Sequence, residues 1–139
     1  MTTVSMSTEL HAPAADVWKI VSDFNGLTGF ISAITESTTQ GSGVGAVRTL
    51  ILEDGTQIIE RLENFDKEAK KFSYSIVSSP LPLEDYLATV RILEINDQCC
   101  KLEWSSSFQP RGVPEAEAKD IIEGIYSMAF KGLQKLFGN

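Results

Sequence analysis

The alternation of apolar and polar residues divides the chain into one strand, two short helical segments, a run of strands and a final helix. Residues 3–10 alternate with the period of a half-buried strand. An apolar stripe at helical spacing follows Pro13 and stops at Asn25-Gly26, and residues 27–31 have room for one further helical turn. From residue 34 to about residue 108, alternating segments are separated by turn-forming residues. This order predicts one domain of α+β class spanning residues 1–139.

Glycine-containing turns separate the predicted strands. Asp54-Gly55 lies between two apolar segments and is a strong signal for a β-hairpin. Gly41, Gly43 and Gly45 resemble a phosphate-binding loop, but such a loop has to follow a strand and begin a helix. Because residues 46–52 have the pattern of a strand, we interpret the three glycines as a turn between strands.

Residues 114–137 are predicted to form a long amphipathic helix. Pro114 suits the first helical position, and Glu115 and Glu117 lie where the helix dipole favours anions. Apolar or small residues recur along one arc of this helix: Ala118, Ile121, Ile122, Ile125, Met128, Ala129, Gly132, Leu133 and Leu136.

Two glycines interrupt the helix. A glycine in a helix interior costs roughly 1 kcal/mol relative to alanine. Small residues at Gly124 and Gly132 indicate either a cavity beneath the helix or close packing against a strand. If the cavity explanation holds, Gly124, Met128 and Gly132 belong to a ligand site.

Composition excludes several classes of function. The chain has 12 basic and 19 acidic residues, and its net charge of −7 opposes binding to nucleic acid or to anionic membranes. It contains no apolar run of about 18 residues and no basic segment followed by an apolar core at its N-terminus. We therefore expect a cytoplasmic protein that neither binds nucleic acid nor inserts into membranes.

Few residues are available for metal or nucleophilic chemistry. Cys99 and Cys100 are adjacent and follow a predicted turn, so we expect two reduced thiols there. The single histidine, His11, rules out a multi-histidine metal site and argues against a Ser-His-Asp triad. No metal or cofactor is expected.

Strand alternation places a small set of polar side chains on otherwise apolar faces, because successive residues of a strand face opposite sides. The faces so predicted combine Arg48 with Leu50, Glu60 with Ile58, Tyr74 with Ile76, and Tyr86 with Ala88. A charge in apolar surroundings needs a partner, so Arg48 and Glu60 are predicted to interact there. The alternative is that Arg48 lies at a strand edge and Glu60 forms a surface pair.

Five short strings follow one another along nearly the whole chain: PAADVW (13–18), GAVR (45–48), ERLENFD (60–66), YSI (74–76) and LPLEDY (81–86). Their order and spacing resemble the helix-grip superfamily of START domains, birch-pollen-type allergens and polyketide cyclases. The polyketide cyclase/dehydrase-like bacterial branch looks closest. The resemblance implies a curved antiparallel sheet of about seven strands wrapped on the last helix. It also implies an internal cavity for an apolar ligand such as a lipid, hormone or polyketide.

Plant abscisic acid receptors look like more distant relatives. By motif match, Glu60 and Tyr86 correspond to positions that line the receptor pocket, and the loops at residues 53–55 and 79–82 are expected to flank its mouth. The receptors carry a lysine for the ligand carboxylate where this chain has Ser32, so we do not expect abscisic acid binding.

Residues 102–108 give two conflicting expectations. Alternation alone places Trp104 toward the core. Matching to the receptors instead places Glu103 and Ser105 inside and gives Arg48 a second carboxylate. We adopt the receptor register, which leaves Trp104 on the outer face as the mark of a homodimer contact.

Three functions fit these observations. The first is binding of a small, largely apolar molecule oriented by Arg48, Glu60 and Tyr86. The second is a polyketide cyclase or dehydratase acting on a carbonyl compound, in which Glu60 is the base, Tyr86 donates a proton and Arg48 stabilises an enolate. The third is an interaction protein whose cavity is fully packed. No nucleophile, metal or cofactor motif supports catalysis, so binding ranks first.

Overall fold

The computed structural model describes residues 1–138 of the 139-residue chain. The elements in order are β1 (Thr2–Leu10), α1 (Ala14–Val21), the 3-10 helix η1 (Leu27–Gly29), β2 (Ile34–Gln40), β3 (Val47–Leu52), β4 (Gln57–Asp66), β5 (Lys71–Ser78), β6 (Leu83–Asn96), β7 (Cys99–Pro110) and α2 (Glu115–Leu136). The predicted order of one strand, two short helical segments, a run of strands and a long helix is confirmed.

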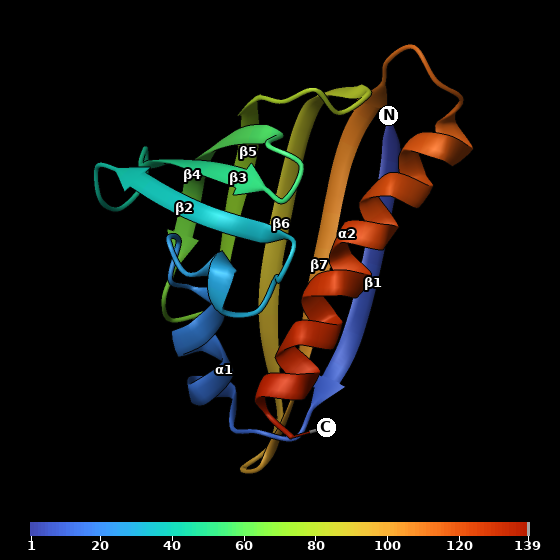
Figure 1. Cartoon of the computed structure of the whole chain (residues 1–139). Helices are drawn as coiled ribbons and strands as arrows, with labels where there is room; N and C mark the ends of the chain where they lie inside the picture. Colours follow the sequence, from blue (N-terminus) through green and yellow to red (C-terminus); the bar gives the residue numbers. More distant parts are fainter. Residues whose placement is uncertain (139) are drawn as a thin grey trace.

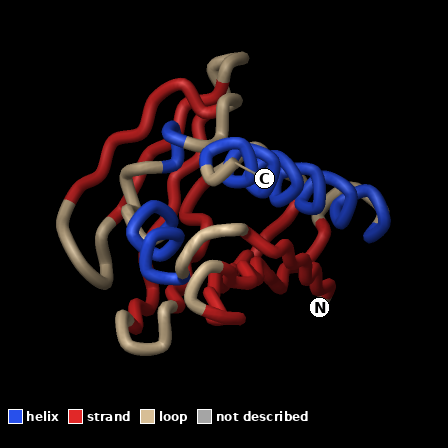
Figure 2. The backbone as a smooth tube through the Cα atoms, turned by 90° about the horizontal axis from the view of Figure 1, so that it is seen from below, coloured by secondary structure: helices blue, strands red, loops and turns tan. Residues whose placement is uncertain are grey.

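The strands form one antiparallel sheet in the order β1-β7-β6-β5-β4-β3-β2. The pairing register shifts at irregular points within β2, β4 and β6. Such bulges bend a sheet and increase its twist. Figure 2 shows the strands curving around the helices. This is the curved sheet wrapped on a long helix that the resemblance implied.

The Asp54-Gly55 turn joins β3 to β4, as predicted. Gly55 adopts φ +87°, and the Asp54 Oδ1 accepts a hydrogen bond of 2.8 Å from the Thr56 amide. An antiparallel hairpin fixes which residues lie opposite each other. Here the register places Arg48 directly opposite Glu60. The three glycines at residues 41–45 likewise lie in the turn between β2 and β3.

Helix α2 lies along β1 and β7 on the concave side of the sheet (Figure 1). Pro114 is its N-cap residue, so the helix begins at Glu115, one position after the predicted start. The buried residues of α2 are Ala118, Ile122, Tyr126, Ala129, Phe130 and Leu133. The inward face is therefore rotated from the predicted arc, because Tyr126 and Phe130 are inside whereas Met128 and Leu136 are exposed.

Neither glycine of α2 opens a space beneath the helix. A Cβ at Gly132 would lie 1.6 Å from the Phe30 carbonyl oxygen, so glycine is required for α2 to touch the chain just after η1. Gly124 is exposed, and no atom lies within 4 Å of the position of its Cβ. Close packing is therefore the correct explanation for Gly132, although its partner is Phe30 and not a strand. The assignment of both glycines to an internal cavity is wrong.

The register adopted for residues 102–108 is also wrong. Trp104 is buried and faces the core, as simple alternation predicts. Glu103 faces outward, 2.6 Å from Arg91 and 3.6 Å from Lys101 across the outer surface of the sheet. Trp104 therefore cannot mark an exposed dimer contact, and Glu103 is not near Arg48.

The adjacent cysteines lie at the β6–β7 hairpin as free thiols, as predicted. Burial, with a smaller contribution from Cys99, raises the pKa of the Cys100 thiol. Within residues 1–138, no helix is both long and apolar enough to cross a membrane.

Candidate ligand-binding cavity

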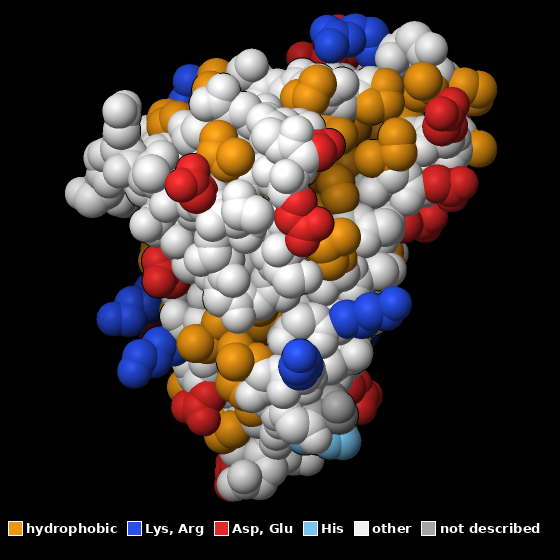
Figure 3. Space-filling model, in the orientation of Figure 1, with side chains coloured by type: hydrophobic (Ala, Val, Ile, Leu, Met, Phe, Trp, Pro, Cys, Tyr) orange, Lys and Arg blue, Asp and Glu red, His pale blue; other side chains and the backbone are white. Residues whose placement is uncertain are grey.

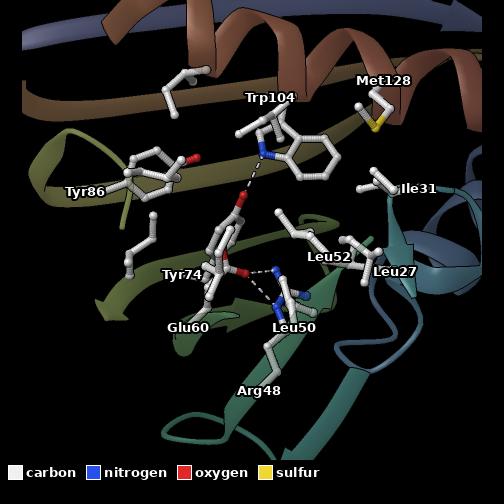
Figure 4. Close-up of a pocket in the computed structure, with 17 residues that line it drawn as sticks. Leu27, Ile31, Arg48, Leu50, Leu52, Glu60, Tyr74, Tyr86, Trp104 and Met128 are labelled. Atoms are coloured by element: carbon white, nitrogen blue, oxygen red, sulfur yellow. Dashed lines mark hydrogen bonds and ion pairs between the residues drawn. The ribbon is translucent and has the colours of Figure 1, made fainter. Parts of the chain in front are cut away.

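A cavity of about 120 Å³ lies between the sheet and α2, with further walls from the segment around η1 (Figure 4). Its walls are mainly aliphatic side chains. The polar groups among them are few and come from four neighbouring strands: Arg48 on β3, Glu60 on β4, Tyr74 on β5, and Tyr86 on β6. The indole of Trp104 on β7 completes this side.

Most of the predicted site residues meet at this cavity. Those that line it are Arg48, Leu50, Glu60, Tyr74, Ile76, Tyr86 and Met128. Ala88 is buried beside them without lining the cavity, and Glu103, Gly124 and Gly132 lie elsewhere. The loop at residues 79–82 contributes Leu81 to the wall, whereas residues 53–55 contribute nothing. Whether the lining residues bind a ligand stays a prediction.

Arg48 and Glu60 form a buried ion pair, which confirms the predicted contact. The Arg48 Nε donates to Glu60 Oε1 at 2.8 Å, and Nη2 lies 2.7 Å from the same oxygen. The remaining Nη1 donates to the Phe24 carbonyl oxygen at 3.0 Å. Arg48 is only 1 % exposed, so the alternative of a strand-edge arginine is wrong.

Aromatic rings hold the Arg48 guanidinium in place. Its Cζ lies 4.1 Å from the centroid of the Phe24 ring and 4.9 Å from that of the Tyr74 ring. Both distances are within the range of cation–π attraction. All the contacts with Arg48 use Oε1 of Glu60, and Oε2 has no hydrogen-bond partner within the described residues. Oε2 is therefore available to a molecule in the cavity.

Aromatic hydroxyl groups connect the sheet to α2. The Trp104 Nε1 donates to the Tyr74 hydroxyl at 3.0 Å, and the hydroxyls of Tyr86 and Tyr126 share a hydrogen bond of 2.5 Å. Sequence reasoning missed Trp104 because the wrong register was chosen for β7. It missed Tyr126 because its partner, Tyr86, lies on a strand far away in the chain. The sequence did offer one signal. Tyr126 precedes Ala129 by three residues, so both lie on the same face of the helix, and Ala129 belongs to the predicted apolar arc.

We predict that none of the chain's three tyrosines ionises while the protein is folded. Burial is the main cause of the raised pKa of Tyr74, Tyr86 and Tyr126, the last to about 12, and the Glu60 charge raises that of Tyr74 further. Below about pH 10, both folded and unfolded states keep these protons. Between pH 10 and about 12, only the unfolded state loses them. The free energy of unfolding therefore falls by roughly 1.4 kcal/mol per pH unit for each tyrosine.

An ultraviolet titration of tyrosinate absorbance, run beside circular dichroism, checks this prediction. Tyrosinate is expected to appear only together with loss of secondary structure. A tyrosinate signal from the fully folded protein at the ordinary phenol pKa of 10 would contradict it.

Comparison with known families supplies the classification. The family described as "Polyketide cyclase / dehydrase and lipid transport" matches residues 1–138. The chain belongs to this family. The predicted resemblance to its branch of the helix-grip superfamily is therefore confirmed. Membership is consistent with a ligand-binding or cyclase-type role. No match to the chain was found among curated proteins.

Solved structures of other proteins have the same fold. The protein XoxI from Bacillus cereus is 34% identical, with a TM-score of 0.94 over 100% of this chain and 97% of its own. A Bacillus thuringiensis protein is also 34% identical, with a TM-score of 0.93 over 99% of this chain and 100% of its own. The Zhui aromatase/cyclase from Streptomyces sp. R1128 shares the fold, with 15% identity and a TM-score of 0.77 over 96% of this chain and 89% of its own.

Proposed function

We propose that the protein binds a small, largely apolar molecule whose enclosed part is uncharged. The observation that carries the proposal is the cavity between the sheet and α2, which is apolar except for a neutralised ion pair and a few hydroxyl and indole groups. Ligand sites generally combine apolar walls with a few polar groups that orient the ligand. The family description, which includes lipid transport, supports the same function.

The size of the cavity limits the ligand. A volume of about 120 Å³ is slightly smaller than the roughly 150 Å³ of an engineered apolar cavity that holds benzene. It is well below the roughly 300–1,000 Å³ of pockets for drug-sized molecules. The enclosed part is therefore about the size of one six-membered ring. A polyketide with several rings would fit only if the walls moved apart.

The charges in the cavity limit the ligand further. Glu60 neutralises the Arg48 guanidinium, so an additional charge placed beside them would lack a counter-ion at a site of low polarity. Glu60 Oε2 can accept a hydrogen bond from a hydroxyl group of the ligand. The enclosed group that fits best is therefore an uncharged ring with one hydroxyl.

We predict that p-cresol binds more tightly than toluene, by about tenfold, because its hydroxyl can donate to the charged Glu60 carboxylate whereas toluene has no donor. A hydrogen bond to a charged group contributes about 1.5–3 kcal/mol net. Isothermal titration calorimetry measures both affinities. Ile125→Trp should abolish binding, because Ile125 lines the cavity and a larger side chain would occupy it. Ile95→Trp makes the same change at an exposed position of β6 and should bind as the wild type does.

Equal affinity for the two compounds would contradict the role of the polar groups. Full binding by a folded Ile125→Trp variant would contradict the cavity as the site. Native mass spectrometry of gently purified protein gives the mass of the natural ligand, as an excess that is lost on denaturation.

A second candidate is a cyclase or dehydratase acting on a carbonyl compound in the same cavity. It is favoured by the family description and by the position of Glu60 and Tyr86 on one cavity wall. Burial raises the pKa of Tyr86, which keeps this hydroxyl protonated and able to donate. The contacts with Arg48, however, occupy Oε1 of Glu60, so only Oε2 is left to take a proton from a substrate. If a carbonyl ligand identified by mass spectrometry is converted equally fast by wild type and Glu60→Gln, this mechanism is excluded.

A further inference from the structure

We infer that the ligand is an amphipathic acid, with its apolar end in the cavity and its anionic group outside, against Lys131 and Lys135. This inference rests on the proposed function and names the chemical class of the ligand. It begins with an open groove of about 660 Å³ beside the cavity. We call it the η1–α2 groove; its walls are residues 28–30 and Ser32 on one side, and Met128, Lys131, Gly132, Lys135 and Leu136 of α2 on the other.

The η1–α2 groove and the cavity share a wall. Met128 lines both, and its side chain is 39 % exposed. Leu27 and Ile31 line the cavity, whereas residues 28–30 and Ser32 line the groove. Figure 4 shows Met128 beside Ile31 at the edge of the cavity.

Met128 is the part of this wall that can move. The contact between Phe30 and Gly132 fixes the segment after η1 to α2, since their backbones touch. Met128 lies one helical turn before Gly132, and methionine is unbranched and adapts to irregular surroundings. Rotation of this side chain would join the groove to the cavity. A ligand longer than the cavity would then leave it through the groove.

The charge of the η1–α2 groove favours an anion. Lys131 and Lys135 are four residues apart, so they lie on the same side of α2. Among the described residues, no aspartate or glutamate lines the groove and neither lysine forms an ion pair. Such a surface is unusual in a chain with a net charge of −7. Figure 3 shows basic side chains over the C-terminal half of α2, below a strip of hydrophobic side chains.

Apolar groups accompany the two lysines. Leu136 is 50 % exposed and lies in the same groove as Met128. A carboxylate attached to an apolar chain complements both parts of this surface, whereas an uncharged alcohol of equal length complements only the apolar part. The ligand class that fits the cavity and the groove together is therefore a carboxylic acid, or a similar anion, with an apolar tail.

The test compares octanoate with 1-octanol. Calorimetry measures the affinity of each for the wild type and for Lys131→Gln/Lys135→Gln. The double variant should bind octanoate about three- to tenfold more weakly at low salt and 1-octanol unchanged, a difference that added salt should reduce. The control Lys67→Gln/Lys119→Gln removes the same charge away from the groove and should leave both affinities unchanged.

Methionine methyl resonances report where the tail lies. The chain has three methionines, so labelling their methyl groups with carbon-13 gives a simple spectrum. The Met128 signal, assigned with Met128→Leu, should shift with octanoate and with 1-octanol.

The possible results separate the two proposals. If neither compound binds or shifts the Met128 signal, the proposed function fails and the inference fails with it. If both bind but the lysine variant binds octanoate as the wild type does, the cavity stands and the anion site is overturned. Sedimentation with phosphatidylglycerol vesicles is measured for the wild type and for Lys131→Gln/Lys135→Gln. If the double variant binds octanoate as the wild type does but no longer sediments with the vesicles, the groove is a membrane-surface site and the inference is overturned.

Discussion

Replacing Gly132 by alanine is expected to destabilise the protein by at least about 3 kcal/mol, the upper range for overpacking a filled space. The new Cβ would lie 1.6 Å from the Phe30 carbonyl oxygen and 2.7 Å from its carbonyl carbon. These are backbone atoms, so no side-chain rotation removes the overlap. Either α2 or the segment after η1 has to move.

Gly124→Ala is the matched control, on the same helix and with the opposite expected sign. Nothing lies within 4 Å of a Cβ at Gly124. Alanine there should stabilise the protein by up to about 1 kcal/mol, because glycine is the poorer helix former. Urea denaturation of both variants measures the difference. If Gly132→Ala is as stable as Gly124→Ala, α2 does not rest on Phe30.

Replacing Arg48 by methionine is expected to cost about 3–5 kcal/mol, the range for breaking a buried ion pair. The loss comes mainly from Glu60, whose carboxylate would stay buried without a cation. A double variant, Arg48→Met/Glu60→Leu, removes both charges and should recover most of the lost stability. Chemical denaturation of the single and double variants tests this.

Arg91→Met provides the comparison for an exposed pair. Arg91 contacts Glu103 at 2.6 Å, a distance similar to that in the Arg48 pair, but the Arg91 side chain is 47 % exposed. Exposed ion pairs contribute about 0–1 kcal/mol, so this variant should lose little. A cost for Arg48→Met no larger than that for Arg91→Met would show that the cavity pair is open to water.

The polar side of the cavity could be predicted because its information is local. A strand has a period of two, so apolar neighbours reveal which way Arg48 and Glu60 face. The Asp54-Gly55 turn then sets the register that puts them opposite each other. The direction in which Arg48 and Glu60 face and their pairing across the hairpin can both be worked out from residues 48–60 alone. Tyr74 and Tyr86 followed from the same alternation in their own strands.

The errors concern information that is not local. Likeness to distant receptors places Glu103 inside, against the alternation of its own strand. On α2, the apolar arc was too broad to define which residues point inward, and Tyr126 is fixed by Tyr86 on β6. Gly132 could be explained in two ways because its partner, Phe30, lies a hundred residues earlier. Cavity size depends on all of these contacts together.

The position of β1 in the sheet has a consequence for synthesis. Thr2 pairs with Phe108, and Leu10 pairs with Cys100, so, among the strands of residues 1–138, the first to be synthesised has its one sheet neighbour in the last. At about 5–20 residues per second, β1 waits roughly 5–20 seconds for β7. An unpaired strand can join a foreign sheet in that time. The outward residues of β1, Thr3, Ser5, Ser7 and Glu9, are polar throughout, which keeps the waiting strand hydrated.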